Sequence, residues 1–366
     1  MAIALGLSIV ILLILYLCYV VKYMQWQHQK TSGDTFFALP LQQRRQLKQT
    51  IKRHSLFVLP FFSLLAKLHP SKTPPLFKHN GVAGPAAVAS KESYQAASDY
   101  PAGEADIFVA TQMKCGTTWM QQIVFEILHA GQGDLSDQGH RHMYALSPWL
   151  ECSPKGSVAI EQAPLVSKHQ KRIIKTHLPA SLCPYNEKAK YIYVTRHPVS
   201  CYASVVDFVD MLAGPMSPKH ADMLDWFCSD DFFFLNWADN VDGWWQWSKQ
   251  YSNVLFVHFE DLKADPEAAI KQVSEFLQVT LDDRELAAVV NKCSFQYMKD
   301  HEESFEMAAP SIFSMRSNTR FMQRGKNKRH QDVRDEDRQC INRYMSSELK
   351  NSSYPLVQYY PDIVEH

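Results

Sequence analysis

Residues 106–119 read DIFVATQMKCGTTW, and this stretch combines several groups that could bind an anion. An apolar run typical of a strand leads into a loop with Lys114 and Gly116, and two threonines then open a helical pattern. Glycine lets backbone N–H groups approach a phosphate, while the helix dipole and the hydroxyls of Thr117 and Thr118 add favourable contacts. The loop is not a Walker A motif, because Lys114 precedes its glycine. Taken alone, it could also be an ordinary tight turn.

Two further apolar runs end in side chains that could bind an anion. RIIKTH at 172–177 closes with His177, and YIYVTR at 191–196 closes with Arg196. Ligands bind at the carboxyl ends of strands in open α/β sheets, and Arg196 precedes Pro198 at an expected helix start, where an anion is favoured. Taken singly, the histidine could cap a loop and the arginine could form a surface ion pair. Together with the first loop, they predict one shared anion site.

The elements that position these groups alternate between strand and helix patterns. Apolar β-rich runs between helical patterns predict an α/β fold, a P-loop-like three-layer fold with a central, mainly parallel sheet. The helix after the first strand is well marked, because apolar residues recur at helical spacing from Trp119 to Leu128, and Asp265 and Pro266 mark another helix start. The predicted strands are 107–111, 172–177, 191–196 and 254–260.

The first 21 residues, MAIALGLSIVILLILYLCYVV, carry no charged side chain. About 20 apolar residues cross the hydrocarbon core as a helix, so we predict that one transmembrane helix over residues 1–22 precedes the α/β fold. A cleaved signal peptide is the alternative. No basic region precedes the apolar run and no small-x-small site follows it, so the anchor is the favoured interpretation.

Charged residues and cysteines indicate on which side of the membrane the main body of the chain lies. Basic residues follow the span, beginning with Lys22 and Lys30, whereas only the amino terminus precedes it, and the positive-inside rule therefore favours a cytoplasmic main body. Eight scattered cysteines without a C-x-x-C pair fit reduced thiols. The sequon at 351–353 would suit the Golgi lumen, which stays the alternative location.

Composition sets the remaining organisation. With 366 residues and 46% hydrophobic content, the chain is long enough to bury a full core. Lys plus Arg and Asp plus Glu both total 38, so the chain has no net electrostatic field that would recruit nucleic acid.

Residues 36–68 either lie in the headgroup region as an amphipathic element or pack on the domain. Residues 69–103 are rich in Pro, Gly, Ala and Ser and indicate a loop or linker. We predict a transmembrane helix at 1–22, a membrane-proximal segment and linker at 23–93, a catalytic domain at 94–350 and a tail at 351–366.

KTHLP at 175–179 and YVTRHPVSCYASVV at 193–206 resemble motifs of the sulfotransferase family that uses 3′-phosphoadenosine 5′-phosphosulfate (PAPS), particularly its cytosolic branch acting on small alcohols, phenols and amines. The resemblance runs from about residue 100 to 330. It implies that Arg196 and Ser204, at the family's spacing, grip the 3′-phosphate, and that a K-x-G-T-T-W loop holds the 5′-phosphosulfate, with its tryptophan on the adenine. The loop residues so implied are Lys114, Cys115, Gly116, Thr117, Thr118 and Trp119.

A further segment of the resemblance is altered. FMQRGK at 321–326 is similar to the family's F-M-R-K-G loop, which closes over the 3′-phosphate, and implies contacts from Arg324 and Gly325. Gln323 stands where the family usually has Arg, and the G-D-W element that follows is absent. Cys115 replaces a serine in the first loop. None of these departures removes a catalytic group.

The resemblance implies His177 as general base, and residue chemistry agrees with that role. A neutral hydroxyl is a poor nucleophile, and a positioned base typically contributes about 10²–10⁴-fold. Lys114 would stabilise negative charge growing on the oxygen that leaves with the 5′-phosphate. Lys175, two residues before His177 and thus on the same strand face, could neutralise the sulfonate oxygens. The sequence shows no metal ligand set.

We therefore predict a membrane-tethered sulfotransferase that moves sulfonate from PAPS to a hydroxyl or amine of a small lipophilic acceptor, such as a sterol or lipid alcohol, and releases adenosine 3′,5′-bisphosphate (PAP). The anchor and the apolar segment 57–65 motivate the choice of acceptor, and residues 211–234 are either an acceptor lid or an ordinary long loop. One alternative is a magnesium-dependent P-loop kinase or nucleotidase. The other is an inactive nucleotide-binding scaffold, and the oligomeric state stays open.

Overall fold

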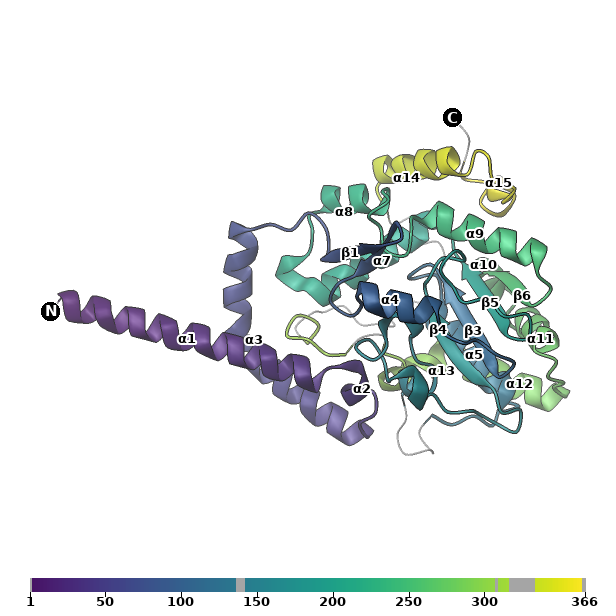
Figure 1. Ribbon diagram of the computed structural model, residues 1–366, viewed down its shortest axis with the longest axis horizontal. Helices are drawn as coiled ribbons and strands as arrows, with labels where there is room; N and C mark the ends of the chain where they lie inside the picture. The colour runs from purple at the N-terminus through teal and green to yellow at the C-terminus, as the bar shows by residue number, and fades with distance from the viewer. Residues whose placement is uncertain (1, 136–141, 307–308, 316–332, 364–366) are drawn as a thin grey trace.

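The computed structural model describes residues 2–135, 142–306, 309–315 and 333–363. At its centre, a parallel sheet runs in the order β4-β3-β5-β6 (Figure 1). Its register places Ala110 beside Thr176 on one side and beside Tyr193 on the other, so the carboxyl ends of three strands meet at one end of the sheet. The strands are β3 (Asp106–Thr111), β4 (Arg172–Thr176), β5 (Lys190–Thr195) and β6 (Val254–His258). The predicted parallel sheet is confirmed, and each strand lies within about two residues of its predicted range.

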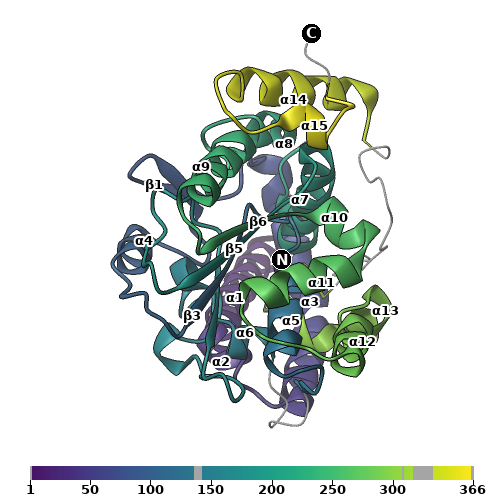
Figure 2. The ribbon, with the colours of Figure 1, turned by 90° about the vertical axis from the view of Figure 1, so that its right-hand side faces the viewer.

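Helices cover both faces of the sheet and produce three layers (Figure 2). Because side chains alternate along a strand, Ile107 and Val109 face one core and Phe108 and Ala110 face the other. The first face is covered by α5 (Thr117–Leu128), α6 (Met143–Leu146), α11 (Pro266–Phe276) and α12 (Asp283–Lys292). The second is covered by α4 (Lys91–Ser98), α7 (Pro198–Ala213), α8 (His220–Phe227), α9 (Trp237–Gln250) and α14 (Asp335–Glu348).

The helix starts that the sequence marks are present. Asp265 accepts a hydrogen bond from Ala268 N at 3.0 Å at the start of α11, and Pro266 is the first residue of that helix. Pro198 likewise opens α7, directly after Arg196 and His197. Three further helices follow the start of the sheet: α10 (Phe259–Ala264), α13 (Phe295–Asp300) and α15 (Leu356–Tyr359). The 3₁₀ turns are η1 (Leu150–Cys152), η2 (Ile160–Gln162), η3 (Gly214–Met216) and η4 (Glu302–Ser304).

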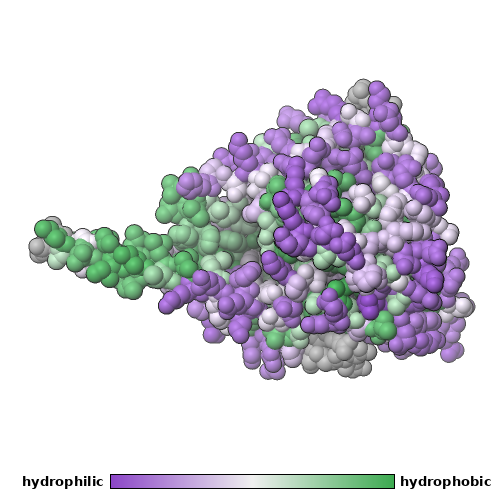
Figure 3. All heavy atoms as spheres, viewed as in Figure 1, coloured by the Kyte–Doolittle hydropathy of each residue, from purple (hydrophilic) through white to green (hydrophobic). Residues whose placement is uncertain are grey.

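Two long helices precede the sheet. α1 (Ala2–Lys30) projects from the body, and α3 (Leu41–Leu68) crosses beside its second half, after the short α2 (Gly33–Phe36) (Figure 1). The stretch Ile3–Lys30 is long and apolar enough to cross a membrane, and almost none of its most apolar window is covered by the rest of the chain. Figure 3 shows it as an apolar rod outside a mostly polar body. By length and composition, this helix is either an anchor or a signal sequence.

The segment before the sheet packs into the body more than its composition suggests. Phe36 and Phe37 are buried in the core on the α5 side, and Val82 is buried in the core on the opposite side. β1 (Leu76–His79) and β2 (Val82–Pro85) form an antiparallel pair inside the stretch expected to be a loop or linker. Strands of four residues give too short a pattern to recognise among Pro and Gly. The division of the chain at residue 94 stays a prediction.

The C-terminal segment is also folded where the structure describes it. Tyr354, Tyr360 and Ile363 are buried in the core beside α9 and α14. His197 Nε2 lies 3.1 Å from an Asp362 carboxylate oxygen, which links this segment to the start of α7. Residues 351–363 therefore pack against the body close to the start of α7.

Candidate active site

The loop between β3 and α5 has a backbone shape that favours glycine. Lys114 has a φ of +66° and Gly116 a φ of +109°. A Cβ atom on Gly116 would lie 2.8 Å from Cδ2 of Phe259, a distance that side chains do not tolerate without movement. Glycine therefore lets the main chain turn directly from the strand into the helix, with Lys114 at the corner.

The first turn of α5 presents polar groups suited to an anion. Its leading N–H groups have no acceptor within the helix, and the helix dipole favours negative charge there. Thr117 Oγ1 lies 2.7 Å from Thr111 Oγ1 at the end of β3. Thr118 Oγ1 is buried and has no hydrogen-bond partner within the described part of the chain, a need that a phosphate oxygen would satisfy. The loop therefore fits a phosphate group.

His177 follows β4 directly, and its ring is held against the end of β3. The Nδ1 atom lies 2.8 Å from the carbonyl oxygen of Thr111 and 3.1 Å from Thr111 Oγ1. A proton on Nδ1 donates to that carbonyl, which makes Nε2 the basic atom. No hydrogen bond from a described residue reaches Nε2. Thr111 therefore joins the histidine to Thr117 of the anion loop.

The electrostatic surroundings keep this imidazole neutral. Burial lowers the pKa of His177 well below its ordinary value of 6.5, and the positive charges of Lys175 and Lys114 lower it further. The hydrogen bond to Thr111 opposes this shift. A neutral ring can take a proton from an acceptor, so the state required of a general base is the resting state.

A buried carboxylate supports the histidine from behind, and sequence reasoning did not predict it. Glu151 in η1 is fully buried, and its Oε1 accepts the backbone N–H of His177 at 2.7 Å and the indole N–H of Trp149 at 2.6 Å. Its Oε2 accepts the Thr176 hydroxyl at 2.9 Å. The only sequence signal is one acid in the apolar run ALSPWLEC, which hints at a buried partner without naming it.

Lys175 is buried on β4 beside aromatic groups. Its Nζ donates to the Tyr144 hydroxyl at 2.7 Å and lies 3.5 Å from the ring centroid of Trp149. Burial lowers the pKa of Lys175 to about 7, although the neighbouring Cys152 and Glu151 partly oppose the shift. A lysine with this pKa changes its charge in the physiological range, so it responds strongly to a neighbouring anion.

Arg196 extends the anion site from the end of β5. Its Nη1 donates to the carbonyl oxygen of Lys114 at 3.3 Å, and its guanidinium stacks 4.7 Å above the ring of Phe259. Ser204 is half-buried on α7, two turns beyond the start of that helix. Arg196 is therefore brought to the β3–α5 loop, as the sequence predicts.

Trp119 and Cys115 occupy different parts of the same corner. Trp119 is half-buried, donates its indole N–H to the Cys293 carbonyl at 2.8 Å, and meets Phe259 edge to face with ring centroids 5.4 Å apart. Cys115 is fully buried, and burial raises the pKa of its thiol well above the ordinary value. The cysteine is a packing residue whose main chain belongs to the loop.

Aromatic rings flank the imidazole of His177. The rings of Trp149 and Phe234 lie 5.2 and 5.1 Å from the imidazole, measured between centroids. Phe234 closes the stretch 211–234, which contains η3 and α8 and is buried in the core through residues of α8 and through its last three residues, 232–234. Phe234 has a positive φ of 66°, which turns the main chain at this residue. The stretch therefore contributes to the site through its last residue.

The structure thus joins most of the predicted residues in one region. The first loop, His177 and Arg196 meet at the carboxyl end of the sheet, with Lys175 and Ser204 on the adjoining strand and helix. Arg324 and Gly325 lie outside the described residues. Within the described ranges, no three His, Cys, Asp or Glu side chains form a cluster that could hold a metal ion.

The chain is similar to known proteins of one family. A family model described as the sulfotransferase domain matches residues 104–353. Sulfotransferase 1C2 of the rabbit (Oryctolagus cuniculus) is 29% identical over 264 residues, which are 70% of this chain and 86% of the relative. Sulfotransferase 1A1 of the rat (Rattus norvegicus) is 30% identical over 228 residues, 60% of this chain and 76% of the relative.

Two solved structures share the fold. The crystal structure of mouse sulfotransferase SULT7A1 complexed with PAP has a TM-score of 0.60 and 22% identity, covering 79% of this chain and 99% of that one. Retinol dehydratase in a complex with retinol and PAP has a TM-score of 0.56 and 20% identity, covering 72% and 87%. The similarity at this level of identity concerns the fold.

Proposed function

This chain belongs to the sulfotransferase family, and from this premise we propose that it transfers a sulfonate group from PAPS to a hydroxyl or amine of a small lipophilic acceptor. One observation supports the proposal most strongly. The neutral imidazole of His177 is joined through Thr111 to Thr117 of the anion loop, so a base and a phosphate-binding helix start lie side by side. An acceptor hydroxyl and an activated sulfonate could meet there.

The described residues fit PAPS in three places. The loop from Lys114 to Thr118 would hold the 5′-phosphosulfate, because its amides, the threonine hydroxyls and the lysine all favour negative charge. Arg196 and Ser204 would bind the 3′-phosphate, and the half-buried ring of Trp119 would stack on adenine. Two solved structures with a similar fold contain PAP, which supports the choice of nucleotide.

The reaction needs one proton transfer and one displacement at sulfur. Nε2 of His177 takes the proton of the acceptor hydroxyl while the hydroxyl oxygen forms a bond to sulfur. The bond from sulfur to the 5′-phosphate oxygen breaks, and its electron pair stays on that oxygen, so PAP and the sulfonated acceptor are the products. Lys114 stabilises the charge that grows on the leaving oxygen, and Lys175 stabilises the sulfonate oxygens.

Glu151 acts as a positioning residue in this scheme. It is fully buried, and its carboxylate binds the main chain of His177, the side chain of Thr176 and the ring of Trp149. Three bonds to one buried carboxylate restrict the angle at which the imidazole leaves the strand. The loss of Glu151 should therefore slow the chemical step more than it weakens nucleotide binding.

A lipophilic acceptor fits the position of the helices that precede the sheet. α3 contacts η3 in the stretch 211–234, and that stretch ends at Phe234 beside His177. One solved relative has been crystallised with retinol and with androsterone, which are both lipophilic alcohols. We propose that α1 anchors the chain in a bilayer and that a sterol or lipid alcohol enters the site from there. The basic residues that follow α1 favour a catalytic domain on the cytoplasmic side of that bilayer. Protease protection in sealed vesicles distinguishes this location from a lumenal one.

The route of the acceptor is tested with the full chain reconstituted in vesicles. A sterol is supplied either in the same vesicles or in separate vesicles, with a soluble phenol as control. We expect turnover of the sterol to be several times faster when enzyme and sterol share a bilayer, and turnover of the phenol to be equal in both mixtures. Equal rates for the sterol would remove the support for delivery from the bilayer.

The cosubstrate is tested against the alternative of a P-loop kinase. We expect transfer of labelled sulfonate from PAPS to a phenol or alcohol to persist in EDTA, with no turnover of ATP. Metal-dependent ATP hydrolysis without sulfonate transfer would favour the kinase. Binding of PAP with no transfer to any acceptor would favour an inactive scaffold.

A further inference from the structure

The helix α3 is divided into two halves of opposite character. Residues 41–55 read LQQRRQLKQTIKRHS, whereas residues 56–68 read LFVLPFFSLLAKL and contain a single charged side chain. The first half packs on the body, with Arg44 and Ile51 buried. In the second half, large apolar side chains are exposed, each by more than half of its surface: Leu56, Phe57, Leu64 and Leu68. A soluble protein rarely leaves such a patch uncovered.

The contacts between α1 and α3 fix the depth of this patch. The Tyr16 hydroxyl of α1 donates to the Phe57 carbonyl at 2.9 Å, so Phe57 lies level with a residue inside the uncharged stretch that ends at Val21. Five helical residues from Tyr16 to Val21 correspond to about 7.5 Å. If α1 fills the hydrocarbon core up to Val21, Phe57 must lie about 7.5 Å below its boundary.

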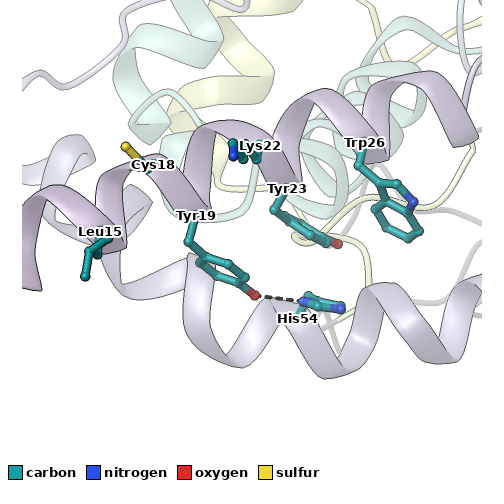
Figure 4. A pocket seen from close by; sticks show the side chains of 7 residues that line it. All are labelled: Leu15, Cys18, Tyr19, Lys22, Tyr23, Trp26 and His54. Carbon is teal, nitrogen blue, oxygen red and sulfur yellow. Dashed lines mark hydrogen bonds between the residues drawn. The ribbon is translucent and has the colours of Figure 1, made fainter.

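The next residues along α1 and α3 have the character of the membrane interface. Tyr19 hydrogen bonds to Nδ1 of His54 at 2.7 Å, and Tyr23 stacks on the same ring at 4.8 Å (Figure 4). Trp26 completes this aromatic group, and the exposed Lys22 lies beside it. Lys52 and Arg53 are exposed on the neighbouring turn of α3. Aromatic rings and basic residues at one level are typical of the headgroup region.

A hydrogen bond joins α1 to α3 at the same depth. The Tyr16 hydroxyl donates to the carbonyl of Phe57, one turn before Pro60 of α3. A polar hydroxyl in hydrocarbon needs such a partner, because no water is available there.

We propose that residues 56–68 of α3 are a second membrane-inserted element, which lies in the acyl-chain region beside α1 without crossing the bilayer. Thirteen residues span about 20 Å as a helix, less than the hydrocarbon core of about 30 Å. The partner is phospholipid, with acyl chains on the Leu and Phe side chains and anionic headgroups on Lys22, Lys52 and Arg53. The proposal rests on α1 being a membrane anchor, and it fixes the body against the membrane through α3, which contacts η3.

Photocrosslinking of the full chain tests this proposal. p-Benzoylphenylalanine is placed at Phe57, at Leu64, at Leu12 of α1 as the bilayer reference, and at Phe295 of α13 as an exposed phenylalanine of the body. Each protein is reconstituted in vesicles of phosphatidylcholine and phosphatidylserine with labelled acyl chains. We expect positions 57 and 64 to take up at least about fivefold more lipid label than position 295, and close to the amount at position 12.

The proposal would be overturned if position 12 takes up lipid label but positions 57 and 64 take up no more label than position 295. Label at none of the positions would overturn both the proposal and the anchor. Each preparation is also assayed for sulfonate transfer from PAPS to a soluble phenol. That activity shows that the variants are folded and separates a failure of membrane insertion from a failure of the proposed function.

Discussion

Glu151 Oε1 accepts the backbone N–H of His177 at 2.7 Å, so a buried carboxylate holds the proposed base through its main chain. The ring of the same histidine is fixed from the other side by Thr111, whose carbonyl lies 2.8 Å from Nδ1. The imidazole is thus constrained at both its backbone and its side chain, and Nε2 is directed away from both partners. The predictions below follow from this arrangement and from the anion loop beside it.

Glu151→Ala should lower turnover by at least about tenfold while the affinity for PAP changes by less than about threefold. The substitution leaves three buried donors without an acceptor, at about 1–3 kcal/mol each, so a lower melting temperature is also expected. Glu151→Gln should recover most of the turnover, because the amide oxygen still accepts from His177 and Trp149. Steady-state kinetics and PAP titration separate the effect on turnover from the effect on PAP affinity.

The control for this prediction is Glu161→Ala, at an exposed residue. Equal loss of turnover and PAP affinity in Glu151→Ala would show a general structural role instead.

Gly116→Ala should weaken PAP binding by at least about tenfold. The new Cβ would lie 2.8 Å from Phe259, and the φ of +109° costs a residue with a side chain about 1–3 kcal/mol. Gly103→Ala is the matched control, because a Cβ there meets no atom within 4 Å. Calorimetric titration of both variants with PAP measures the effect. Wild-type affinity in Gly116→Ala would contradict the assignment of the loop.

The affinity for PAPS should fall as the pH rises above about 7, because burial lowers the pKa of Lys175 to about 7. A sulfonate group bound beside Lys175 raises that pKa, so PAPS binding takes up a proton. The affinity for PAPS then falls by up to about tenfold for each pH unit above the pKa of the free protein. The 3′-phosphate is largely a dianion in this range and does not add a step. Lys175→Met should flatten the dependence, whereas Lys188→Met, on an exposed lysine, should not. An unchanged slope in Lys175→Met would remove this lysine from the anion site.

Arg196→Gln should reduce the preference for PAP over adenosine 5′-phosphate. A charge-assisted hydrogen bond contributes about 1.5–3 kcal/mol, so PAP affinity should fall by about 10- to 100-fold, whereas affinity for the monophosphate should change little. Competition titrations with both nucleotides give the ratio, and Arg338→Gln on α14 is the control. An equal loss for both nucleotides would mean that Arg196 only supports the loop through the Lys114 carbonyl.

The parts of the site that follow from local spacing could be predicted from the sequence. Lys114, His177 and Arg196 each come at or just after the end of a predicted strand, and parallel strands bring such ends together. The strand ranges themselves were predictable because buried parallel strands are continuous apolar runs between helices. The sequence pattern thus predicted both the sheet and the end at which the chemistry lies.

Other parts depend on contacts between distant segments and could not be predicted. Glu151 precedes His177 by 26 residues, and only the path of η1 beneath β4 brings the two together. The sequence does not determine whether α3 packs on the body, because its basic first half and apolar second half fit both a membrane-surface helix and a packed helix. In the structure the two halves differ in burial: Ile51 in the first half is buried, and Phe57 in the second half is exposed.

Transfer of labelled sulfonate from PAPS by the wild type and by His177→Ala, with PAP affinity measured on the same preparations, tests the central claim most directly. We predict a fall in turnover of at least about a hundredfold in the variant, because a positioned base contributes about that much. The affinity for PAP should stay within about threefold, and the exposed-site variant His301→Ala should match the wild type. Undiminished turnover in His177→Ala would contradict the account.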